Sequence, residues 1–127
     1  MGLNYIGYGG KGLQIRDILY VDDFSLLIKK QILSFPKINN KLFCIGGGKN
    51  NSITLKKLTE KCQNITKNYP KIESVPETSK YDIPVFISSN KKIKKFYNWL
   101  PKTNINNILE FNLKWLKKDF KKIKKFF

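Results

Sequence analysis

Hydrophobic positions along the chain form helical patterns interleaved with short extended runs. Leu55, Leu58, Cys62 and Ile65 recur three or four residues apart behind the capping oxygen of Thr54, which predicts an amphipathic helix. The same spacing predicts a final helix from Ile105 to Phe127. We also expect a helix from Phe24 to about Leu33, capped by Asp22-Asp23, and a loop around Pro36 and Asn39-Asn40 after it. A further helix is expected to follow Ser88-Ser89-Asn90, whose side chains would cap it, and to run through Tyr97.

Between these helices lie short β-branched or apolar runs that predict strands. Leu42–Ile45 is unbroken and apolar, which is typical of a strand covered on both faces. Gly7–Gly12 predicts a hairpin turn, and Gly46–Gly48 a turn from strand to helix. The other expected strands are 3–6, 14–21, 71–75 and 85–87, with a loop at 76–82, so the fold class is α/β.

Length and composition fit one domain. The chain has 127 residues and is 41% hydrophobic, enough to build a core. It contains no apolar run of the roughly 20 residues that a membrane-spanning helix needs. We therefore expect a cytoplasmic protein.

The formal net charge of +16 raises the question of a polyanionic partner. Arg16 is the only arginine, and the remaining basic residues are lysines, which favours compositional drift toward lysine on solvated faces. The Lys-rich end of the last helix nevertheless resembles a polyanion- or membrane-binding helix. A small basic module that binds nucleic acid or a membrane surface is therefore the alternative function, with nucleic acid unfavoured.

Metal and nucleophile chemistry find little support. The chain has no histidine and only two cysteines, Cys44 and Cys62, which we expect to be reduced core thiols. Gly7-x-Gly9-x-x-Gly12 matches the dinucleotide fingerprint as a bare pattern, but a strand pattern follows it instead of a helix. We expect no metal and no catalytic residue in this chain.

Arg16 is the most informative candidate. It lies mid-strand, where a planar guanidinium directed into a pocket would suit a diphosphate, because two parallel hydrogen bonds fix both orientation and charge. The alternative is a salt bridge between Arg16 and a local aspartate.

Taken in order, these motifs resemble the C-terminal half of the NAD-dependent nucleotide-sugar epimerase/dehydratase family, the extended short-chain dehydrogenases. The resemblance covers residues 3 to about 116 and is greatest to the CDP-paratose/CDP-tyvelose 2-epimerase branch. It implies an α/β fold of short strands and amphipathic helices without the N-terminal Rossmann core. We expect a partial epimerase domain over 1–116 and a Lys-rich helix end over 117–127. The matching segments are 10–23 (GKGLQIRDILYVDD), 42–55, 76–84 and 89–103.

The resemblance also implies substrate-binding roles. Arg16 matches the arginine that binds the substrate diphosphate, and Tyr8 falls near the aromatic that packs on the nucleotide base. Ile53 matches an apolar contact, and Asp82 matches the acidic residue at the edge of the nucleotide-sugar pocket. A second arginine of the family is missing, and Lys80 is its candidate substitute.

The family's catalytic Tyr-x-x-x-Lys is not encoded in these residues, because no tyrosine has a lysine four positions later. Intact members use NAD and are often dimeric, whereas we expect no cofactor on this chain alone. The prediction is a truncated or split epimerase, inactive by itself, that supplies the nucleotide-sugar-binding half to a separately encoded N-terminal half. Whether the chain counts as an enzyme stays open.

Overall fold

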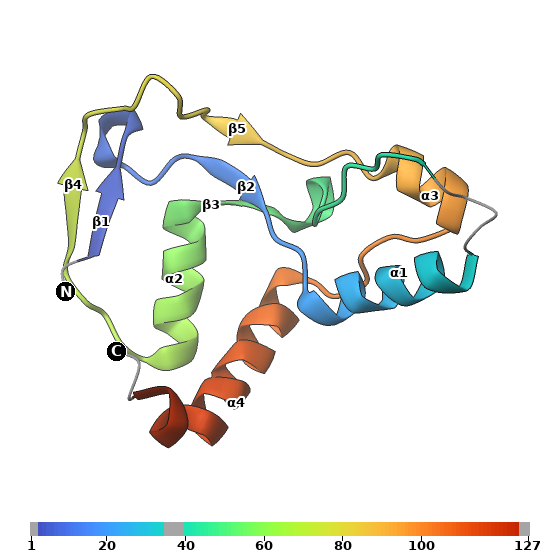
Figure 1. The fold of residues 1–127 in the computed structure, drawn as a ribbon. Coiled ribbons are helices and arrows are strands. Elements are labelled where there is room, and N and C mark those ends of the chain that lie inside the picture. Colours follow the sequence, from blue (N-terminus) through green and yellow to red (C-terminus); the bar gives the residue numbers. More distant parts are fainter. Residues whose placement is uncertain (1–2, 35–39, 125–127) are drawn as a thin grey trace.

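A computed structural model describes residues 3–34 and 40–124, in which small sheets and helices alternate along the chain (Figure 1). The strands stand at one side of the molecule and in its middle, and α1 and α3 lie at the other side. The elements, in chain order, are β1 (Leu3–Ile6), β2 (Ile15–Asp17), α1 (Val21–Ser34), β3 (Ser52–Thr54), α2 (Leu55–Thr66), β4 (Ile72–Val75), β5 (Val85–Phe86), α3 (Lys91–Tyr97) and α4 (Ile105–Ile123).

The strands form two separate sheets. In the first, β1 runs parallel to β4, with Leu3 opposite Ile72. In the second, β2 lies between β3 and β5, antiparallel to β3 and parallel to β5. The α/β class and the strand at 3–6 are confirmed, the strand expected over 71–75 forms as 72–75, and the strand expected over 14–21 is only three residues long.

The predicted helices form, and two have side-chain caps, of which the one at Thr54 was predicted. The Thr54 hydroxyl accepts the Lys57 backbone N–H at 3.2 Å at the start of α2. The Asn104 side chain accepts the Asn107 N–H at 3.0 Å at the start of α4. Each cap satisfies a backbone donor that has no partner within its helix.

The core lies between α1, α3 and the segment that follows α3. Leu27 and Ile93 are completely buried, and Tyr97 and Trp99 pack with them. The Trp99 indole donates to the Asp23 carbonyl at 3.1 Å, so this aromatic is both packed and hydrogen-bonded.

The strand predicted at Leu42–Ile45 is wrong. The segment is irregular, although Phe43 and Ile45 pack against the core. A strand needs a neighbour for its backbone N–H and C=O groups, and no strand pairs with this segment in the described part of the chain. Leu42 is therefore exposed, and so is Cys44, which contradicts its expected place in the core. Cys62 is half-buried and free, and burial raises its pKa.

The hairpin predicted at Gly7–Gly12 is also wrong, because β1 and β2 belong to different sheets. The stretch contains a short 3-10 turn, and the Gly7 N–H donates to the Val75 carbonyl at 2.8 Å. Gly10 has φ +63°, and a Cβ there would lie 1.9 Å from the Ser74 hydroxyl. Only glycine fits this contact with the β4 backbone.

Two predicted caps serve other contacts. α1 begins at Val21, so Asp22 and Asp23 lie inside its first turn. The buried Asp23 carboxylate instead accepts the backbone N–H groups of Lys102 and Thr103, at 3.0 and 2.9 Å. Asn90 precedes α3 without capping it, because its amide bonds to the N–H and the carbonyl of Gly46.

Two further expectations concern the glycine turn at 46–48 and the loop after α1. A short 3-10 turn and β3 separate the glycines from α2, so the turn does not lead directly into a helix as predicted. The loop residues Pro36 and Asn39 lie outside the described residues.

Candidate functional site

A cavity of about 290 Å³ opens between β2, β3, the start of α2 and the loop before β5. Its walls are mostly apolar, with one cation and one carboxylate. The lining residues are Gln14, Arg16, Ile18, Ile53, Leu55, Leu58 and Asp82. Three of the five predicted substrate-binding residues therefore meet at one cavity.

Arg16 and Ile53 are brought together by strand register, because they are paired positions of β2 and β3. Paired positions of antiparallel strands carry their side chains on the same face of the sheet. The site thus combines a cation with an apolar surface over a distance of one strand spacing.

The Arg16 guanidinium is fixed by two contacts. Its Nη2 lies 2.9 Å from Asp82 Oδ1, and its Nη1 donates to the Ile15 carbonyl at 2.8 Å. The side chains of Arg16 and Asp82 are 43% and 32% exposed, so water screens the pair and its net stabilisation is small. The alternative of a salt bridge holds in part, but the partner is an aspartate 66 positions away rather than a local one.

Asp82 is itself held by its loop. Its Oδ1 also accepts the Ile83 N–H at 2.9 Å, and its own N–H donates to the Ser79 carbonyl at 3.0 Å. The carboxylate therefore faces Arg16 in a defined orientation.

Tyr8 lies behind Asp82 and does not line the cavity. Its hydroxyl donates to the Asp82 carbonyl at 2.7 Å, and its N–H donates to the Thr78 hydroxyl at 2.7 Å. Desolvation and, to a smaller extent, the Asp82 charge raise the pKa of Tyr8, with Arg16 opposing. Tyr8 thus connects the glycine-rich turn to the Asp82 loop.

Lys80 is not brought to the cavity. Its ammonium sits 4.9 Å from the ring centroid of Tyr81, and both side chains are exposed. This cation–π contact holds the lysine on the outer side of the loop.

Sequence reasoning missed Gln14 as a lining residue. Its amide nitrogen donates to the Ile6 carbonyl, while its Oε1 is buried without a hydrogen-bond partner in the described part of the chain. Gln14 lies two positions before Arg16, and alternate residues of an extended segment share a face. This two-residue repeat could have identified Gln14 as a neighbour of Arg16 in the cavity.

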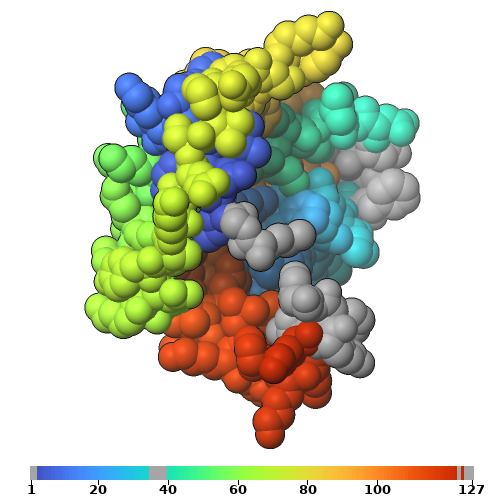
Figure 2. Space-filling model, turned by 90° about the vertical axis from the view of Figure 1, so that its left-hand side faces the viewer, coloured from blue at the N-terminus to red at the C-terminus, as the bar shows by residue number. Residues whose placement is uncertain are grey.

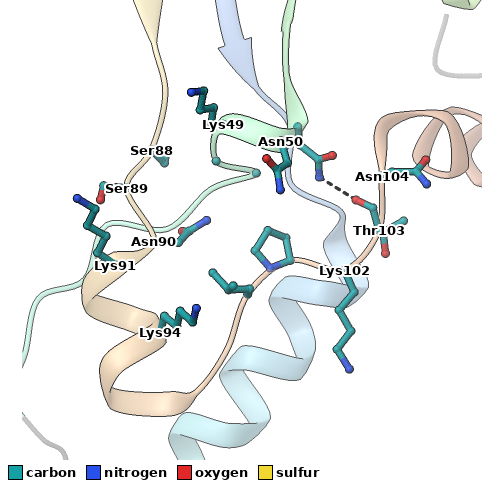
Figure 3. Close-up of a pocket in the computed structure, with 15 residues that line it drawn as sticks. Lys49, Asn50, Ser88, Ser89, Asn90, Lys91, Lys94, Lys102, Thr103 and Asn104 are labelled. Atoms are coloured by element: carbon teal, nitrogen blue, oxygen red, sulfur yellow. Dashed lines mark hydrogen bonds between the residues drawn. The ribbon is translucent and has the colours of Figure 1, made fainter.

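A larger cavity of about 560 Å³ lies between the turn before β3, the start of α3 and the segment leading into α4 (Figure 3). None of the five predicted residues lines it. Four lysines border it, and in Figure 3 the side chain of Lys102 points away from those of Lys49 and Lys91. The Asn51 amide donates to the Thr103 carbonyl at 2.8 Å across one wall, so part of its polar lining is already satisfied.

The glycine-rich stretch does not fit a dinucleotide. A dinucleotide fold places the pyrophosphate at the N-terminus of a helix that follows the glycines. Here Gly7–Gly12 leads into β2, and Gly10 packs against the β4 backbone. The stretch is part of the sheet junction.

No protein-family model matches the chain. The chain is 30% identical over 115 residues to the UDP-glucuronate 4-epimerase of Thermodesulfobacterium geofontis, covering 91% of the chain and 34% of that enzyme. It is 27% identical over 106 residues to the CDP-paratose 2-epimerase of Salmonella typhi, covering 84% of the chain and 31% of that enzyme. The chain thus spans about a third of the length of the curated relatives it matches.

Solved structures of an epimerase and a dehydratase also contain a part with a similar fold. The UDP-glucose 4-epimerase of Thermotoga maritima with UDP-glucose has a TM-score of 0.72 and 26% identity, covering 91% of this chain and 35% of that one. The dTDP-glucose 4,6-dehydratase of Bacillus anthracis in complex with NAD has a TM-score of 0.68 and 24% identity, covering 89% and 34%. The second likeness shows the fold alone.

The fold is therefore that of the C-terminal part of an extended short-chain dehydrogenase. The chain is similar in sequence and fold to the C-terminal part of nucleotide-sugar epimerases, and in fold alone to the corresponding part of an NAD-binding dehydratase. Both a 4-epimerase and a 2-epimerase match, so the more specific branch stays a prediction.

Two further observations concern membrane-spanning helices and clusters of metal-binding side chains. In the described part of the chain, no helix combines the length and apolarity needed to cross a bilayer. The same residues contain no cluster of three or more histidine, cysteine or acidic side chains that could hold a metal ion.

Proposed function

We propose that this chain is the nucleotide-sugar-binding part of an epimerase and that the cavity around Arg16 receives the nucleoside diphosphate. The observation that carries the proposal is the meeting of Arg16, Ile53 and Asp82, which are distant in sequence, around one mostly apolar cavity. The apolar wall suits a flat base, and the guanidinium suits a diphosphate.

Within that cavity each side chain has a distinct task. Arg16 would exchange its contact with Asp82 for hydrogen bonds to the diphosphate, while its bond to the Ile15 carbonyl keeps the guanidinium in place. Ile53 would contact the base, and the buried Gln14 Oε1 is an acceptor for a base N–H or a ribose hydroxyl. Tyr8 would act as a positioning residue through the Asp82 carbonyl, and Lys80 would remain outside.

The redox part of the reaction would come from elsewhere. In the intact family NAD supplies the hydride chemistry, and a tyrosine with a lowered pKa moves the hydroxyl proton. The 127 residues contain no Tyr-x-x-x-Lys, and their glycine-rich stretch does not fit the dinucleotide. We propose that these residues alone neither bind NAD nor epimerise a nucleotide sugar, and that the protein acts in the cytoplasm.

A second polypeptide segment would cover the exposed apolar side chains of α1 and of the irregular segment 42–45. Ile32, Leu33 and Leu42 are large apolar side chains exposed to water on these elements. Exposed apolar groups on adjoining elements are typical of an interaction surface. We propose that an N-terminal half, separately encoded, packs here; a dimeric assembly is the family-based expectation.

Calorimetric titration of the chain with UDP-glucose and with CDP-glucose tests the binding proposal. Arg16→Ala should weaken binding by about 1.5–3 kcal/mol, the scale of a charge-assisted hydrogen-bonding site. Its unfolding free energy should change by less than about 1 kcal/mol, because the Arg16–Asp82 pair is partly exposed.

Lys80→Gln provides the matched control, because it also removes one positive charge near the site while the lysine lies outside the cavity. Equal loss of affinity in both variants would reduce the Arg16 effect to general electrostatics. Undiminished binding by Arg16→Ala would show that Arg16 does not contribute to the binding site.

A further inference from the structure

The C-terminal half of α4 exposes large apolar side chains. Trp115, Leu116 and Phe120 are 56%, 41% and 58% exposed. Successive residues of an α-helix are about 100° apart, so these three lie within an arc of about 140° on one side of the helix. In Figure 2 the helix forms an orange-red lobe at one end of the molecule.

The opposite side of the same turns is strongly basic. The only acidic residue of these turns, Asp119, lies on the apolar side, and its carboxylate is paired with Lys122 at 3.3 Å. The helical repeat distributes the lysines over the rest of the circumference. They are Lys114, Lys117, Lys118, Lys121, Lys122 and Lys124.

The N-terminal half of α4 already anchors the helix to the body of the protein. Ile108 is buried, the rings of Phe111 and Tyr20 lie 5.4 Å apart, and Lys61 donates to Asn106 at 2.7 Å. The exposed turns after Lys114 are therefore a projecting extension of a docked helix.

We propose that α4 from Lys114 to Lys124 is an interfacial helix that lies on bilayers containing anionic lipid. Trp, Leu and Phe on one side would enter the headgroup region, and the lysines around them would pair with lipid phosphates. Each lysine near an anionic surface favours binding, and partitioning of the aromatic side chains adds a salt-independent contribution. The inference does not depend on the nucleotide-sugar cavity.

Charge complementarity selects this occupant over others. A second copy packed through the apolar side would cover Leu116 and Phe120 but would leave the lysines of both helices without anionic partners. A nucleic acid would neutralise the lysines but would leave Leu116 and Phe120 without an apolar partner. An anionic bilayer satisfies both sides of the helix.

Vesicle co-sedimentation and tryptophan fluorescence test the proposal on the full chain. The protein should bind phosphatidylcholine vesicles that contain phosphatidylglycerol and should not bind phosphatidylcholine alone. Trp115 emission should shift to shorter wavelength on binding, while Trp99 is already buried in the core and should contribute no shift.

Two variants separate the apolar and basic contributions. Phe120→Ser should lower the partition coefficient about tenfold. Lys117→Gln combined with Lys118→Gln should lower it about 10- to 30-fold. Lys56→Gln combined with Lys57→Gln removes the same charge from exposed positions of α2 and should have a clearly smaller effect.

Several results would overturn the inference. Absence of binding to anionic vesicles, or an equal loss in the two lysine pairs, would exclude α4 as a membrane-specific site. Unchanged vesicle binding by Phe120→Ser, together with displacement by polyuridylate, would assign the lysines to a polyanion instead. Circular dichroism of each variant confirms that α4 is retained.

Discussion

The helical side of the molecule and its strands are held together in different ways. Around α1 and α3, Leu27 and Ile93 have no exposed surface, and the buried Trp99 packs with them. In the strands, every described residue is at least partly exposed. There the connections are hydrogen bonds between distant segments, such as that from the Ile15 N–H of β2 to the Pro84 carbonyl at 2.9 Å.

This difference separates stability from binding. Burial of apolar surface is the main source of folding stability, and it is concentrated in the helical region. A hydrogen bond contributes only about 1 kcal/mol net, so the strands add less stability for each contact. Their half-exposed groups remain available to a ligand, and the Arg16 cavity is found there.

The largest expected effect is in the helical core. Leu27→Ala should lower the unfolding free energy by about 2–5 kcal/mol, because Leu27 is 0% exposed and its removal leaves a cavity. Urea denaturation measures the loss. Leu26→Ala is the neighbouring control, because Leu26 is 55% exposed and should cost much less. Similar losses in both variants would contradict the proposed location of the core.

A smaller effect is expected where the core is joined to α4. Asp23→Asn should lower the unfolding free energy by about 1–3 kcal/mol, because the charged acceptor of two backbone N–H groups is lost. Asp22→Asn changes the same charge at the adjacent, exposed position and serves as control. If Asp22→Asn proved the more destabilising in thermal unfolding, the junction would lie elsewhere.

The smallest effect concerns the strands and is pH-dependent. Because the pKa of Tyr8 is raised in the folded chain, the folded state holds the phenolic proton more tightly than the unfolded state. This contribution to stability is present below about pH 10, the ordinary tyrosine pKa, and is lost as the pH rises through the raised value.

The stability advantage of the wild type over Tyr8→Phe should therefore shrink as the pH rises above about 10, the ordinary tyrosine pKa. Denaturant midpoints at several pH values measure this difference, and lysine titration affects both proteins alike. A wild-type advantage that grows with pH would contradict a raised pKa for Tyr8 and would show that the Tyr8–Asp82 contact does not cause the effect.

Local sequence patterns determined the helices and the residue types of the site. Apolar spacing and the capping oxygen of Thr54 act within a few residues, so α2 and α4 could be predicted without knowing their neighbours. Arg16, Ile53 and Asp82 could be predicted as substrate-binding residues because the order of the motifs along the chain resembles that of the family. The structure brings these three residues together around one cavity.

Only the tertiary structure decided what each polar or extended segment would contact. Asp23 looks like a helix cap in sequence, but the fold brings Lys102 and Thr103 within its reach. Leu42–Ile45 has the composition of a strand, yet a strand exists only where another strand meets its backbone groups. Lys80 is close to Asp82 in sequence, but the loop turns it onto Tyr81 and away from the cavity. Spacing along the chain specifies local conformation, whereas partners distant in sequence are chosen by packing and by the satisfaction of buried hydrogen bonds.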